Sequence, residues 1–188
     1  RAAAMQPAIP QNEKWDNAKG LDILNQIEQN TLRLAPMKPD VMFWPEATLP
    51  YPIKGDIAMQ TWVERLATEI DTPILAGALA AESTEDWRNG VYLIRPKWGM
   101  YPEYYSKRHL VPFGEYIPFR NLWPWIEKVV PIEGDLYSGK EPTLLPLSMP
   151  ERTINIGSLI CYEDVFPSLA RESVLEGAAI LFVATNSA

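Results

Sequence analysis

The chain has 188 residues, of which 47% are hydrophobic and 11% aromatic, so it can bury a core and is not a disordered sequence. Its net charge of −7, with no cluster of lysine or arginine, argues against a nucleic-acid partner, because phosphates are bound by basic surfaces. One cysteine and one histidine exclude an internal disulfide and the usual clustered zinc sites, and we expect neither a metal nor a cofactor.

Short apolar segments alternate with amphipathic ones along the chain. Runs bounded by Pro, Gly or Asp and rich in β-branched or aromatic residues predict strands at 41–44, 72–80, 90–95, 153–162 and 178–186. Apolar residues spaced three and four apart predict helices over 21–35 and 57–70, the second with Asp56 as N-cap. A third helix is expected over 167–176, closed by Gly177. This order of elements predicts an α/β fold that ends in a β-α-β unit.

Two features bear on the extent of the domain. The stretch from 112 to 150 follows neither the helical nor the strand period, and loops of that length inside a domain are usually functional or disordered. The sequence stops directly after an apolar run, where a sheet would normally continue. We therefore expect a single domain over residues 1–188 whose C-terminal part is missing. No apolar segment reaches the roughly 18 to 20 residues that span a bilayer.

Three reactive side chains lie at the C-terminal ends of predicted strands: Glu46 after VMFWP, Lys107 after YPEYYS and Cys161 after INIGSLI. Because the carboxyl ends of strands in an α/β sheet lie along one edge, we expect these side chains to meet there. A carboxylate can accept the proton of a thiol, and an ammonium can stabilise the negative charge that develops on a substrate carbonyl oxygen. The backbone N–H of Tyr162 is a second candidate donor to that oxygen. The pattern predicts acyl transfer through Cys161.

Simpler interpretations stand beside this one. A lone cysteine after an apolar strand is often a small core residue, and glutamate and lysine are common surface residues. His109 lies two residues after Lys107, where it could be imagined as a partner of Cys161, but nothing in the spacing makes it a base. A structural or gating role is favoured for His109.

The segments FWPEATLP, YYSKRHLVPFGEYIPFR and GSLICYEDVFP, in this order, resemble the three catalytic blocks of the nitrilase (carbon–nitrogen hydrolase) superfamily. The resemblance extends from AAMQPAIPQNEKWD to FVATN, and SKRHLVPFGEYIP is most similar to the apolipoprotein N-acyltransferase branch. It implies an α-β-β-α sandwich in which Glu46 is the general base, Lys107 the oxyanion stabiliser and Cys161 the nucleophile.

The resemblance also implies supporting residues. Glu115 and Glu163 match acidic positions that line the active site in this superfamily, and Trp15 resembles a position near the acyl-chain entrance of its acyltransferases. An ordinary half-buried tryptophan is an equally good interpretation of Trp15. The family usually continues its last block as NDAWFG, whereas Asn186 is followed here by Ser187.

The activity implied by the resemblance is an N-acyltransferase. It would move an acyl chain from a phospholipid, through a thioester on Cys161, to the N-terminal diacylglyceryl-cysteine amine of an apolipoprotein. The implied location is the bacterial inner membrane, with this domain in the periplasm after a bundle of membrane helices. A soluble nitrilase-family amidase acting on a small amide would use the same three residues. A non-catalytic binding module on the same fold is disfavoured because all three reactive positions are present.

One aromatic segment has two interpretations. In FRNLWPWIEKVVPI (119–132), Trp123 and Trp125 either pack inward as a satellite of the core or form an apolar lid beside the active site. The lid would suit a lipid substrate, because tryptophan favours the membrane interface.

Overall fold

The computed structural model describes residues 1–10, 14, 16–119 and 135–186. The strands are β1 (Ala2–Ala4), β2 (Val41–Trp44), β3 (Ile74–Ala81), β4 (Trp87–Arg95), β5 (Gly99–Met100), β6 (Tyr105–Ser106), β7 (Leu145–Ser148), β8 (Thr153–Ile160) and β9 (Ile180–Ala184). The α-helices are α2 (Gly20–Leu34), α3 (Ile57–Glu69) and α4 (Pro167–Leu175). Short 3-10 helices are η1 (Asn17–Lys19), η2 (Ala35–Met37) and η4 (Cys161–Val165).

The strands form two sheets. The larger has the order β1-β2-β3-β4-β5, with β6 also paired to β4. Its first three strands are parallel, and β4 runs antiparallel to β3, β5 and β6. The smaller sheet has the order β7-β8-β9, in which β8 is antiparallel to β7 and parallel to β9.

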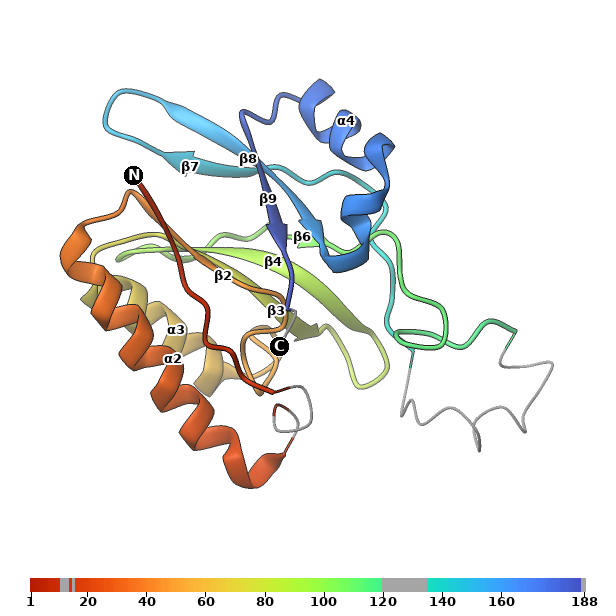
Figure 1. The fold of residues 1–188 in the computed structure, drawn as a ribbon, viewed down its shortest axis with the longest axis horizontal. Coiled ribbons are helices and arrows are strands. Elements are labelled where there is room, and N and C mark those ends of the chain that lie inside the picture. The colour runs from red at the N-terminus through yellow and green to blue at the C-terminus, as the bar shows by residue number, and fades with distance from the viewer. Residues whose placement is uncertain (11–13, 15, 120–134, 187–188) are drawn as a thin grey trace.

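The two sheets lie face to face between helices (Figure 1). Helices α2 and α3 cover the outer face of the larger sheet, and α4 lies beyond the smaller sheet. Side chains from the inner faces of both sheets make one buried cluster, which includes Val91 and Leu93 of β4 and Ile156 and Ile160 of β8. This arrangement is the predicted α-β-β-α sandwich.

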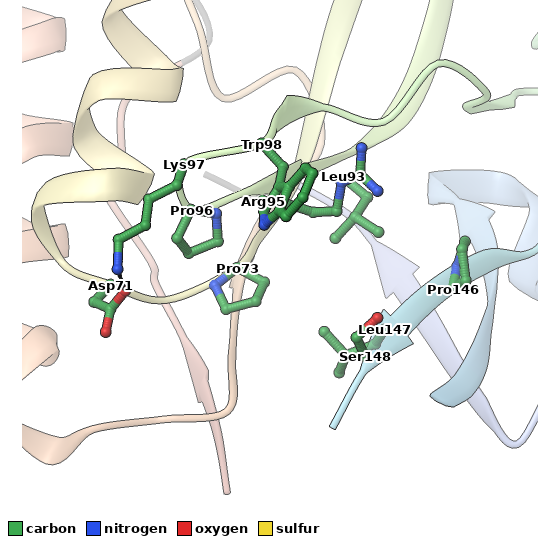
Figure 2. A pocket seen from close by; sticks show the side chains of 10 residues that line it. All are labelled: Asp71, Pro73, Leu93, Arg95, Pro96, Lys97, Trp98, Pro146, Leu147 and Ser148. Atoms are coloured by element: carbon green, nitrogen blue, oxygen red, sulfur yellow. Dashed lines mark ion pairs between the residues drawn. The ribbon is translucent and has the colours of Figure 1, made fainter. Parts of the chain in front are cut away.

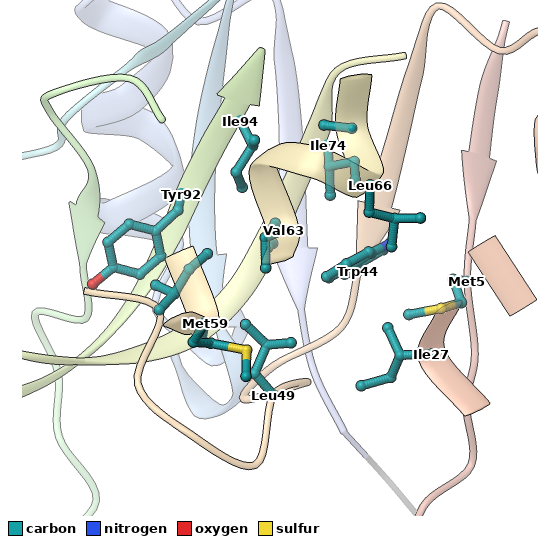
Figure 3. Packing of buried hydrophobic residues seen from close by; sticks show 14 of the residues in the cluster. Met5, Ile27, Trp44, Leu49, Met59, Val63, Leu66, Ile74, Tyr92 and Ile94 are labelled. Atoms are coloured by element: carbon teal, nitrogen blue, oxygen red, sulfur yellow. The ribbon is translucent and has the colours of Figure 1, made fainter. Parts of the chain in front are cut away.

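The second core lies between the larger sheet and its helices (Figure 3). The indole of Trp44 on β2 is fully buried there, between Ile27 of α2 and Leu66 of α3. The buried residues of α3 fall on the predicted helical face, and the Asp56 carboxylate accepts a hydrogen bond from the Met59 N–H as the predicted N-cap. This packing fixes β2, the strand that precedes Glu46.

The predicted elements are confirmed with shifted bounds and several additions. β4 begins at Trp87, three residues before the predicted strand, and β8 ends at Ile160 because Cys161 already belongs to η4. The final β-α-β unit is confirmed: β8 and β9 are parallel, and Gly177 follows α4 with a positive φ of 101°. The sequence missed β7, which lies in the stretch interpreted as a loop.

Within the described part of the chain, no helix is both long and apolar enough to cross a membrane.

Candidate active site

Glu46 lies on a tight turn after β2. The Thr48 hydroxyl donates to the Pro45 carbonyl at 2.6 Å, and the Thr48 N–H donates to the Gly77 carbonyl at 2.8 Å. A Cβ on Gly77 would lie 2.4 Å from the Pro45 oxygen, so only glycine lets the turn pack so closely on β3. Lys14 Nζ donates to the Glu46 carbonyl oxygen at 3.1 Å. The backbone that carries the Glu46 carboxylate is therefore held from several sides.

Lys107 follows the short strand β6. Its N–H donates to the Asn89 carbonyl on β4, and its carbonyl accepts from the Gly139 N–H, both at 2.8 Å. The side chain is only 1% exposed. Lys107 Nζ lies 2.8 Å from Glu115 Oε1 and 3.7 Å from Glu46 Oε1. A buried ammonium thus faces two carboxylates.

Asn89 joins the same group. Its Nδ2 donates to Glu46 Oε1 at 2.9 Å and to Glu115 Oε1 at 3.3 Å. The other oxygen of Glu115 accepts from the Val111 N–H at 2.9 Å, which anchors the carboxylate to its own loop. Glu115 therefore contacts the ammonium and the amide directly.

Cys161 stands at the junction of β8 and η4 with a positive φ of 51°, a conformation that costs a residue with a side chain about 1 to 3 kcal/mol. The charges of Glu46 and Lys107 both act on its thiol, so the sulfur lies near these two side chains. Burial, and then the negative charge of Glu46, raise the pKa of the Cys161 thiol, although the charge of Lys107 opposes this shift. The thiol thus lies near a carboxylate that can accept its proton.

Glu163 is fully buried. Its two oxygens accept four hydrogen bonds of 2.7 to 3.0 Å, from the Tyr105 hydroxyl and from the backbone N–H groups of Arg108, His109 and Ile160. Because these donors come from both sides of the site, the carboxylate joins the segment after Lys107 to the turn that carries Cys161.

The structure brings Glu46, Lys107 and Cys161 together, but one premise of the prediction is wrong. The three residues do not share the edge of one sheet. Glu46 and Lys107 come from the larger sheet, and Cys161 comes from the smaller one, so the site lies between two sheets.

The remaining predicted residues have separate outcomes. The ring of His109 packs on Phe166, with centroids 4.5 Å apart, and the Tyr162 side chain is 48% exposed beside the same phenylalanine. Trp15, Trp123 and Trp125 lie outside the described residues.

Sequence reasoning missed Asn89 and Lys14. Lys14 is 2% exposed, and burial lowers its pKa to about 8, although the nearby charge of Glu46 raises it. The only sequence signal for Lys14 is its place beside Trp15 in NEKWD. For Asn89 the signal is a polar residue directly before the apolar run at 90–95.

A cavity of about 590 Å³ opens elsewhere, lined by Arg95 and Trp98 on one side and by Leu147 and Ser148 of β7 on another (Figure 2). Arg95 is six residues from Asn89 along β4, a distance of about 20 Å in an extended strand. The cavity is therefore separate from the candidate active site. Among the residues described here, no group of three or more His, Cys, Asp and Glu side chains is arranged to hold a metal ion.

The whole chain, residues 1–188, matches the family model for carbon-nitrogen hydrolases, and the chain belongs to this family of enzymes. Among its relatives are apolipoprotein N-acyltransferases from Geobacter metallireducens, 31% identical over 100% of this chain, and from Rhizobium rhizogenes, 32% identical over 98% of it. The chain spans 36% of the length of each of these relatives.

Solved structures support the fold. A mutant of the amidase from Nesterenkonia sp. AN1 superimposes with a TM-score of 0.66 over 98% of this chain and 66% of that chain, at 19% identity. That structure shows the result of addition of acrylamide at the amidase's active-site cysteine. The nitrilase-like fold predicted from the sequence is thus confirmed.

Proposed function

We propose that this chain is the catalytic domain of a bacterial apolipoprotein N-acyltransferase. The observation that carries the proposal is that relatives of that name match this chain almost from end to end at about 30% identity. The cluster of Glu46, Lys107 and Cys161 supports it, because acyl transfer needs a base, an oxyanion donor and a nucleophile within contact of one another.

In the first half of the reaction, Glu46 takes the thiol proton while the sulfur of Cys161 attacks the ester carbonyl carbon of a phospholipid. The ammonium of Lys107 and the N–H of Tyr162 stabilise the tetrahedral oxyanion. When the intermediate collapses, the carbon–oxygen bond breaks and Glu46 returns the proton to the leaving hydroxyl. The products are a lysophospholipid and a thioester on Cys161.

In the second half, the α-amine of a diacylglyceryl cysteine at the N-terminus of an apolipoprotein attacks the thioester. Glu46 takes a proton from the amine, the carbon–sulfur bond breaks, and the proton passes to the departing sulfur. The result is an amide on the lipoprotein and a free thiol on Cys161, ready for another cycle. Water must be excluded for transfer to exceed hydrolysis.

This proposal places the protein at the bacterial inner membrane, with the domain on the periplasmic side. The partners are then a phospholipid donor, an apolipoprotein acceptor and the membrane surface. Supporting residues in the proposal are Glu115, which holds Lys107, and Glu163, which holds the turn of Cys161. Trp15 stays a candidate for the acyl-chain entrance.

Mass spectrometry of the intact protein after incubation with phospholipid vesicles tests the proposal. We expect one acyl chain on Cys161, which disappears when a diacylglyceryl-cysteine peptide is added and becomes acylated. Cys161→Ala should abolish both events, and Lys107→Met should slow them by roughly 10²- to 10³-fold through loss of an oxyanion donor. Lys97→Met, which changes an exposed lysine at the distant cavity, is the matched control.

Two results would contradict the proposal. A Cys161→Ala protein that still acylates the peptide would exclude the thioester. Turnover of a small amide by a parent protein that never carries lipid would favour the amidase instead.

A further inference from the structure

We propose that Asn89 is a positioning residue that keeps the carboxylates of Glu46 and Glu115 ionised and fixed around Lys107. This inference rests on the proposed function, because it concerns the base of that reaction. It assigns a role to a side chain that the mechanism above does not use.

Asn89 is placed rigidly. The residue lies on β4, which pairs with β3 along the whole of β3. Asn89 is only 3% exposed. Its carbonyl accepts the Lys107 N–H at 2.8 Å, so the backbones that carry the amide and the ammonium are bonded to each other. The backbone of Asn89 is therefore fixed relative to the backbone of Lys107.

The orientation of the amide follows from its neighbours. Nδ2 has two hydrogens, and both acceptors within reach are carboxylate oxygens, at 2.9 Å on Glu46 and 3.3 Å on Glu115. The reversed amide would put its oxygen against both carboxylates. Oδ1 is buried and has no hydrogen-bond partner among the described residues, so the observed orientation is kept by its two donors alone.

The electrostatic effect has a definite sign. Glu46 is faced by Lys107 after β6, by Glu115 from the following loop, by Cys161 after β8, and by Lys14 at its backbone. Two carboxylates that share one ammonium repel each other, which favours a proton on one of them, whereas hydrogen bonds to a carboxylate favour its charged form. One N–H of Asn89 donates to Glu46 and the other to Glu115, so together they oppose the binding of a proton by the pair of carboxylates. The bond to Glu46 Oε1 also fixes the plane of the carboxylate that receives the proton of Cys161.

The test is the pH dependence of Cys161 acylation in the intact protein, with p-nitrophenyl butyrate as the acyl donor. With this soluble ester, the rate of Cys161 acylation reports on Glu46, Lys107 and Cys161 without the phospholipid or the lipoprotein. Asn89→Leu removes both donors without adding charge. We expect the midpoint of the acidic limb to rise by about one pH unit, with about a tenfold loss below the midpoint and recovery above it.

A second variant keeps the shape of the side chain. Asn89→Asp replaces two donors with a third carboxyl group, so we expect an upward shift of the acidic limb at least as large as that of Asn89→Leu. Leu93→Ala, buried on the same strand and in the inner core, is the structural control. It should lower the melting temperature and leave the midpoint in place.

The outcomes separate the two proposals. If the parent acylates Cys161 but neither Asn89 variant moves the midpoint, the role of Asn89 is wrong and the proposed function stands. If both the soluble ester and phospholipid vesicles leave Cys161 of the parent unmodified, the proposed function falls, and the role of Asn89 falls with it.

Discussion

At the scale of single residues, Glu46 has two opposite effects on Cys161. Its charge raises the pKa of the thiol, after burial as the larger cause, yet its carboxylate is the acceptor through which the thiol would be activated. Glu46→Gln should therefore lower the pKa of the thiol and increase its alkylation by iodoacetamide at pH 8 severalfold, while ester acylation falls by about 10²-fold or more.

The two rates are measured on the same preparation, with Glu103→Gln as an exposed control. Alkylation and acylation that fall together would show that the charge of Glu46 does not oppose thiolate formation.

Lys14 gives a prediction about stability and pH. Its pKa is about 8 in the folded protein, below its ordinary value of 10.5, because burial disfavours the charged form. Between these two values the unfolded chain binds a proton that the folded chain does not, so the free energy of unfolding should rise with pH across this window. In Lys14→Met that contribution is absent.

Urea denaturation at pH 7.5 and pH 10 measures the effect. The stability of the parent relative to Lys14→Met should increase by up to about 3 kcal/mol over this interval. Exposed Lys97→Met should show no such change, and an unchanged difference between parent and Lys14→Met would mean that the Lys14 pKa is not lowered.

The sequence indicated the three candidate reactive residues, and the family resemblance indicated Glu115 and Glu163, but neither indicated Asn89 or Lys14. Glu46, Lys107 and Cys161 stand out because their chemical types complement one another and follow apolar segments. Asn89 does not stand out, because an asparagine near the start of a strand usually contacts solvent or belongs to a turn. Its role becomes visible only in the folded chain, where its amide on β4 donates to two carboxylates from other segments. Lys14 was missed for the same reason, because its burial depends on the turn of Glu46.

At the scale of elements, periodicity worked where one face of an element is buried. Helices α2 and α3 were predicted within a few residues for this reason. Strands β2, β3 and β9 were predicted instead as short apolar runs, although β9 is largely exposed. β7 was missed because a proline interrupts its short LPLS run, and β6 because two residues are too few for any period. Lys107 thus follows a strand that local sequence could not reveal.

The turn η4 depends on one buried carboxylate. Glu163→Gln would place an amide N–H₂ against N–H and O–H donors and remove the charge that all four donors stabilise. We expect a loss of about 2 to 4 kcal/mol in the free energy of unfolding. Thermal denaturation measures this, and Glu172→Gln, whose exposed carboxylate pairs with Arg108, should cost less than about 1 kcal/mol. Equal losses would mean that Glu163 contributes only as a surface charge does.

At the scale of the whole molecule, the site exists only because two sheets pack face to face. Each sheet supplies part of the chemistry, and the inner core of Val91, Leu93, Ile156 and Ile160 sets their separation. Sequence order alone could not show this, since Cys161 and Lys107 follow strands of different sheets. The family resemblance supplied the sandwich that local patterns could not.

The exposed aromatic residues around Glu115 give a prediction about the membrane. Phe113 is 51% exposed and Phe119 66% exposed, and both lie on the loop that carries Glu115, which extends away from the sheets (Figure 1). Tyr137, 49% exposed, follows Leu136, whose N–H donates to the Glu115 carbonyl at 2.7 Å. With a net charge of −7, the chain gains little from anionic headgroups, so contact with a bilayer should depend on these apolar rings.

Phe113→Ser combined with Phe119→Ser should therefore slow acylation of Cys161 by vesicle-embedded phospholipid about tenfold or more, and leave acylation by soluble p-nitrophenyl butyrate within about twofold. Trp98→Ala removes a still more exposed ring at the distant cavity and should change neither rate. Raising the salt concentration should have little effect on the parent with vesicles, because screening weakens electrostatic binding but not apolar contact. Equal losses with both donors would indicate that the two rings support the Glu115 loop, and a strong salt dependence would indicate binding through charge.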